Sequence, residues 1–190
     1  MLKRILGAGL LVLLGTAPAF AHLDPVAHGS FLAGFTHPLF GLDHILAMVA
    51  VGLWAASLGG RALWVVPAAF VGTMALGFFA SLAGMPLPFV EPAILASVIF
   101  MGIVVALALS LPLGAGAALV AFFALFHGHA HGGEMGMAGA WSYALGFLAA
   151  TVLLHAGGIA LGLAARHHAT AIRVAGGLAA LGGGWLALAG

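Results

Sequence analysis

The sequence contains no cysteine. Disulfides, thiolate metal sites, iron–sulfur clusters and a cysteine nucleophile are therefore excluded. A bound metal would have to be held by histidine, carboxylate, methionine or backbone oxygen. Charge is also scarce, because the 190 residues include five Lys or Arg and four Asp or Glu. Five basic residues cannot form the basic face that nucleic acid requires, so nucleic-acid binding is excluded as well.

The chain is instead rich in apolar residues, glycine and histidine. Hydrophobic residues make up 64% of the chain, with 30 glycines and ten histidines, and the mean hydropathy is +1.26. Soluble domains contain only about 45–50% apolar residues. The composition therefore predicts an integral membrane protein, rich in histidine, with the lipid bilayer as a partner.

The first 21 residues have the layout of a signal peptide. Lys3 and Arg4 precede an apolar run at 5–14, and an A-x-A site ends at Ala21. The run is shorter than the roughly 20 residues that span a bilayer. We expect cleavage after Ala21, which would leave His22 at the N-terminus.

Two histidines follow this expected cleavage site. The free amine and imidazole of His22 could chelate a metal together, or this histidine is incidental. His28 lies in a short polar segment and is either a capture ligand or a solvated loop residue.

Residues 22–190 are predicted to form one transmembrane domain, an all-α bundle of about six helices. The apolar stretches are 39–58, 62–83, 92–111, 114–126, 140–165 and 172–189, and the short fourth one is expected to continue beyond Phe126. Six crossings would place both mature termini in the periplasm of a bacterial inner membrane. Arg61, Arg166 and Arg173 then lie in cytoplasmic loops, as the positive-inside rule requires.

The segment 37–52, HPLFGLDHILAMVAVG, combines two histidines and an aspartate with an apolar helix. A carboxylate beside imidazoles is costly in such a setting, and metal binding would explain it. Pro38 suits the first helical position, which would put His37 at or just before the cap. About two helical turns then separate His37 from His44, so both could project from one face beside Asp43. Gly41 leaves room for a ligand or a neighbouring helix.

A second cluster, FHGHAHGGE, occupies 126–134. On a helix, the i, i+4 and i+7 spacing brings His127, His131 and Glu134 to one face, where they can chelate one ion, and His129 points elsewhere. Three glycines weaken the helix, so a helix that ends in a glycine-rich ligand loop is equally consistent. A solvated, nonspecific histidine-rich loop is the other alternative.

Two isolated polar residues have two interpretations each. Glu91 precedes a proline and either stabilises a helix start or supplies an oxygen ligand or proton acceptor. His155, inside an apolar stretch, is either a hydrogen-bonded core residue or part of a pathway. Nitrogen and oxygen ligands suit nickel, cobalt, zinc or iron, whereas copper(I) would have to rely on Met135 and Met137.

Four segments, HPLFGLDHILAMVAVGLWA, VEPAILASV, FHGHAHGGE and GFLAATVLLHAGG, occur in this order after the signal peptide. Together they resemble the HupE/UreJ family of secondary nickel and cobalt transporters over nearly the whole mature chain. The resemblance implies that His37, Asp43 and His44 match the family's metal signature. By the same resemblance, His127, His131 and Glu134 match its second motif, and the His22 region its N-terminal histidine.

The leading hypothesis is an inner-membrane importer of Ni²⁺ or Co²⁺, with Zn²⁺ and Fe²⁺ as further candidates and no prosthetic group. His22 and His28 would capture the ion, and His155 would relay it inward. The metal-ligand candidates are His22, His28, His37, Asp43, His44, Glu91, His127, His131, Glu134 and His155.

Two other functions stay open, an intramembrane metalloenzyme and a metal-sensing accessory subunit. The enzyme lacks an HExxH pattern, which zinc proteases use for two ligands and a general base. The glycine faces at 176–177 and 182–184 would allow close helix packing, either within the chain or in a homo-oligomer.

Overall fold

The computed structural model describes residues 31–135 and 139–189, and every regular element in these ranges is an α-helix. The expected signal peptide, His22, His28 and Met137 lie outside the described residues. The prediction of an all-α membrane protein is confirmed. The helices are α2 (Phe31–Phe40), α3 (Leu42–Leu58), α4 (Ala62–Leu82), α5 (Val90–Ala106), α6 (Leu113–Glu134), α7 (Ala140–Ala164) and α8 (Ala169–Ala189).

Several of these helices can cross a bilayer. By length and apolar composition, α4, α6, α7 and α8 each qualify, and α2 and α3 qualify together as one span bent by 82°. The apolar helix α5 has 17 residues and is shorter. Large apolar side chains such as Leu181 and Leu188 of α8 face outward, as contact with lipid requires. The protein is therefore a multi-pass membrane protein, and six crossings stay a prediction.

The start of the first apolar stretch differs from the prediction. A single helix beginning at Pro38 is wrong, because the chain is already helical from Phe31 and Pro38 lies inside α2. Proline has no N–H to donate to the preceding turn, which weakens a helix at this point. The chain then becomes extended at Gly41 (φ −80°, ψ 110°), and α3 begins at the next residue.

The fourth apolar stretch continues beyond Phe126, as predicted. Helix α6 runs without a break to Glu134, so the cluster at 126–134 is helical and not a glycine-rich loop. Its glycines have a packing role. A Cβ on Gly128 would overlap the backbone of Met74, and one on Gly132 would crowd Phe78 and Ser81 in α4. Glycine here lets two helices approach closely, which is a common way to join helices in membranes.

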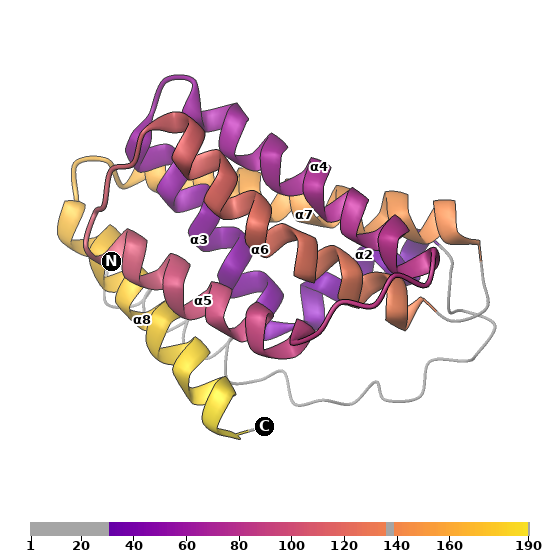
Figure 1. The fold of residues 1–190 in the computed structure, drawn as a ribbon. Coiled ribbons are helices and arrows are strands. Elements are labelled where there is room, and N and C mark those ends of the chain that lie inside the picture. The colour runs from indigo at the N-terminus through magenta and orange to yellow at the C-terminus, as the bar shows by residue number, and fades with distance from the viewer. Residues whose placement is uncertain (1–30, 136–138, 190) are drawn as a thin grey trace.

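The same device joins the other main helix pairs. Helix α3 packs on α7, and α5 packs on α8, through glycines whose Cβ atoms would overlap the partner backbone. Figure 1 shows α4 running beside α6 and α7, with α8 in yellow beside α5. Gly176 and Gly183 of α8 contact α5, so part of each predicted glycine face packs within the chain. The glycines at these contacts are Gly52 and Gly158, Gly77 and Gly128, and Gly102 and Gly176.

The packed interior contains polar side chains as well as apolar ones. Trp54, Phe70, Phe78 and Phe147 are among its largest fully buried residues. Four of the six buried polar side chains in the described ranges are histidines. A bundle this apolar needs a specific reason to bury them.

Candidate metal centre

Three histidines from three helices meet at one end of the bundle. His37 lies in the last turn of α2, His44 in the first turn of α3 and His131 in the last turn of α6. Each offers one ring nitrogen, and these atoms all lie within 4.8 Å of one another. Metal–nitrogen bonds of about 2.1 Å place two ligand atoms up to about 4.2 Å apart. Small side-chain rotations would therefore let this histidine triad bind one ion.

The bend at Gly41 creates the triad. The spacing predicted that His37 and His44 share the face of one continuous helix, which is wrong. They face each other from consecutive helices, with ring centroids 5.9 Å apart. Gly41 also leaves room for the ligands themselves. A Cβ there would lie 2.9 Å from Asp43 Oδ1 and 3.0 Å from His44 Nδ1.

Each carboxylate of the cluster accompanies one histidine. Glu134 Oε2 lies 2.9 Å from His37 Nε2, and both side chains are partly exposed, at 46% and 37%. Asp43 Oδ1 lies 3.0 Å from His44 Nδ1, without the geometry of a hydrogen bond. Carboxylates in such positions can bind the metal or orient the imidazole that does.

The spacing predicted that His127, His131 and Glu134 share one face of α6, and the three side chains differ in their exposure. His127 and His131 are fully buried, whereas Glu134 is exposed and reaches His37. His131 stacks on Phe147 with a centroid distance of 4.7 Å. His129 points elsewhere, as predicted, because its Nε2–H donates to Met85 O at 2.8 Å.

Further histidines continue from the triad into the bundle. The His127 ring lies 5.0 Å from that of His44. Phe70 of α4 contacts both His127, at 5.5 Å, and His155 of α7, at 5.0 Å. His155 is 1% exposed. The structure thus connects the partly exposed His37 to the deeply buried His155 through aromatic side chains.

Each of the four buried histidines in the described part of the chain has at least one ring nitrogen without a hydrogen-bond partner. Within residues 31–135 and 139–189, every buried side-chain nitrogen or oxygen without a partner is an imidazole nitrogen. A buried polar group left unsatisfied costs about 1–3 kcal/mol, so each one needs an explanation. The atoms are His44 Nδ1 and Nε2, His127 Nδ1, His131 Nδ1 and Nε2, and His155 Nδ1 and Nε2.

Two other predicted positions lie apart from the triad. Glu91 is exposed in the first turn of α5, where a carboxylate is favoured by the helix dipole. Met135 follows the end of α6 and packs against the apolar core.

Sequence reasoning missed two contacts of His127. Ser97 Oγ of α5 lies 2.9 Å from His127 Nε2, and Phe70 packs on its ring. A lone serine in the apolar segment VEPAILASV was a signal that could have been followed. Nothing in the sequence distinguishes Phe70 from the other phenylalanines.

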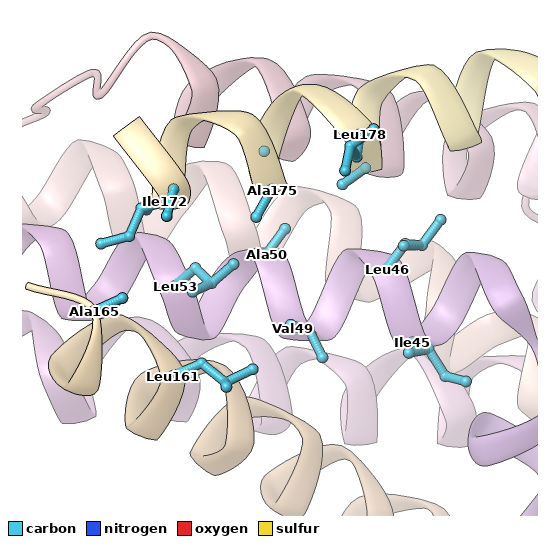
Figure 2. A pocket seen from close by; sticks show the side chains of 13 residues that line it. Ile45, Leu46, Val49, Ala50, Leu53, Leu161, Ala165, Ile172, Ala175 and Leu178 are labelled. Carbon is cyan, nitrogen blue, oxygen red and sulfur yellow. The ribbon is translucent and has the colours of Figure 1, made fainter. Parts of the chain in front are cut away.

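A separate cavity of about 420 Å³ lies between α3, α7 and α8. Figure 2 shows Ala50 and Leu53 of α3 facing Ile172 and Ala175 of α8, with Leu161 of α7 on the other side. All 13 lining residues are apolar. Their side chains supply no metal ligand, so this cavity is not part of the histidine path.

Comparison with known proteins adds two matches. The model of the family described as HupE / UreJ protein matches residues 10–186. Protein HupE of Rhizobium leguminosarum bv. viciae is 51% identical over 170 residues, which cover 87% of this chain and 87% of that protein. No solved structure has a significant match to this chain. Both matches extend over the helices that carry the histidines described above.

Proposed function

The chain belongs to the HupE/UreJ family, and from this premise we propose that it is a secondary transporter that imports nickel or cobalt. The metal is its cargo, and the protein needs no prosthetic group. It would reside in the bacterial inner membrane, with its mature termini in the periplasm.

One observation carries the proposal, namely the unpartnered nitrogens of four buried histidines. Metal-binding imidazoles must be unprotonated, with a lone pair free for the ion. A single structural site would need only the triad. Here unpartnered nitrogens also occur at His127 and His155, beyond the triad. Several weak binding sites along a path favour stepwise transfer, because each site binds the ion and can release it to the next one.

The distribution of charge supports an orientation of the protein that suits import. The triad lies where α3 begins and α6 ends, whereas Arg61 and Arg173 lie near the starts of α4 and α8, at the opposite end of the bundle. The positive-inside rule favours a cytoplasmic position for the arginine end. The triad would then face the periplasm, where it receives the ion for import.

The membrane potential can drive this import. A divalent cation gains about 4.6 kcal/mol per 100 mV on moving inward. The described acidic residues, Asp43, Glu91 and Glu134, all lie at the triad end of their helices. The deeper path therefore has histidines and no carboxylate for proton coupling within the described ranges, which favours a uniport.

The ligand chemistry supports nickel or cobalt as cargo. Imidazole with a few carboxylate oxygens suits borderline divalent ions, and the lack of thiolate disfavours copper(I). Zinc and iron have overlapping preferences, so they are the competitors to test.

Uptake of radiolabelled Ni²⁺ and Co²⁺ into proteoliposomes, with an inside-negative potential and competing Zn²⁺, Fe²⁺ and Cu⁺, tests the proposal. We expect saturable uptake by the wild-type protein and none by His131→Gln. His129→Gln is the matched control, because this histidine lies on the same helix and bonds to Met85 instead. Metal binding without uptake would contradict transport and favour a sensor or an enzyme.

A further inference from the structure

Ser97 is a buried polar residue of α5 whose hydroxyl has two close partners. Its Oγ lies 2.6 Å from Ile94 O and 2.9 Å from His127 Nε2. A hydroxyl has one hydrogen to donate, and a carbonyl oxygen can only accept. The Ser97 hydroxyl therefore donates to Ile94 O. Ser97 Oγ in turn accepts a hydrogen bond from His127 Nε2–H.

This network assigns the tautomer of His127. A neutral imidazole carries one N–H, so a hydrogen on Nε2 leaves a lone pair on Nδ1. His127 Nδ1 is buried and has no hydrogen-bond partner among the described residues. Histidines that bind metals usually donate their other ring N–H to an oxygen in this way, which fixes the tautomer and orients the ring.

We propose that Ser97 is a positioning residue that prepares His127 Nδ1 to receive the metal from the triad. This inference rests on the proposed transport function. His127 lies next to His44 of the triad on one side and contacts Phe70, which in turn contacts His155. Ser97 thus acts on the histidine that follows the triad on the path.

The hydroxyl matters because two other buried histidines, His131 of the triad and His155, have no such hydrogen bond to any described residue. Neither nitrogen of His131 or His155 is hydrogen-bonded within the described ranges, so nothing there selects one tautomer. Without the Ser97 hydroxyl, His127 could likewise adopt either tautomer. Some molecules would then carry hydrogen on Nδ1, and these cannot use that atom as a ligand.

Three variants test the role of Ser97 in the full chain. Ser97→Ala removes the acceptor, and Ser97→Thr keeps the hydroxyl. Ser57→Ala is the matched control, because Ser57 Oγ makes the same kind of bond, to Trp54 O at 2.7 Å, near the end of α3 opposite His44. The tautomer is read by ¹⁵N NMR of metal-free protein in bilayers, with His127 assigned by comparison with His127→Gln. Ni²⁺ affinity is measured by calorimetry.

We expect the Nε2–H tautomer of His127 in the wild type, Ser97→Thr and Ser57→Ala, and a mixture of tautomers in Ser97→Ala. Nickel should bind about tenfold more weakly to Ser97→Ala alone, in line with substitutions next to metal ligands. An unchanged tautomer and affinity in Ser97→Ala would overturn the inference.

The wild-type spectrum decides the inference even if Ser97→Ala does not fold, because an Nδ1–H tautomer there would overturn it. Failure of the wild type to take up nickel would instead count against the proposed function. The tautomer and the nickel affinity would still decide the role of Ser97 in that case.

Discussion

His37 Nε2 lies 2.9 Å from Glu134 Oε2, which joins the last turn of α2 to the last residue of α6. Both side chains are partly exposed, whereas the other two members of the triad are buried. The pair therefore stands at the entrance to the histidines. The carboxylate can hold the His37 imidazole in place for an arriving ion, or bind and steer the ion itself.

Replacing Glu134 with Gln should weaken the capture of metal. The substitution keeps the shape of the side chain but removes its charge, so His37 loses an anionic partner. We expect metal affinity to fall about tenfold, as for other residues that orient a ligand. Calorimetric titration with Ni²⁺ measures the change. Equal affinities in Glu134→Gln and the wild type would show that the pair is only a surface contact.

Gly41 offers a test of the bend itself. Its backbone angles suit alanine, but a Cβ would lie against Asp43 Oδ1 and His44 Nδ1. Gly41→Ala should therefore lower the affinity for Ni²⁺ about tenfold, with little change in thermal stability.

Gly114→Ala is the control for this variant, since nothing lies within 4 Å of a Cβ there and the residue is at the opposite end of α6. Equal nickel affinities in the two variants would contradict the role assigned to Gly41.

The glycines of the histidine cluster make a separate prediction about stability. Gly128→Ala would drive a Cβ into the backbone of Met74, whereas Gly133→Ala, on the same helix, meets open space. Overpacking costs about 1–3 kcal/mol, and alanine in an exposed helix gains up to about 1 kcal/mol over glycine. Thermal unfolding in detergent should show a lower midpoint for the first variant and an unchanged or higher one for the second. The reverse order would mean that α4 and α6 do not pack at Gly128.

The sequence predicted the parts of the site that depend on local spacing. The i, i+4 pattern of His127 and His131 holds because α6 is a regular helix to Glu134. The bend at Gly41 was not predictable, because the ten residues of α2, which include Thr36 and His37, are too few to indicate a helix that shares a span. The sequence therefore predicted His37 at or just before the cap of one continuous helix, whereas it lies in the last turn of α2.

Contacts between helices were also beyond the reach of the sequence. Ser97 and Phe70 meet His127 only because α5 and α4 approach α6 at particular registers. The register of α4 against α6 is set by glycine contacts such as Gly128 with Met74. A glycine in an apolar helix indicates that another helix can pack closely there, but the sequence does not identify that helix.

The position of His155 makes a final prediction, because it separates binding from transport. His131 belongs to the triad, whereas His155 lies deeper and connects to the triad through Phe70 and then His127. Nickel at about a hundred times its Kd should stabilise the wild type by about 2.7 kcal/mol. We expect His131→Gln to lose this stabilisation and His155→Gln to keep most of it.

Uptake into proteoliposomes should be lost in both variants, since the ion could enter the triad of His155→Gln and reach His127 but would find no histidine beyond it on the described path. Thermal shifts with and without Ni²⁺, measured beside uptake, distinguish the two defects. Normal uptake by His155→Gln would make this residue a structural histidine. The transport path would then have to leave the triad in another direction, because His155 is the only described histidine that Phe70 connects to His127.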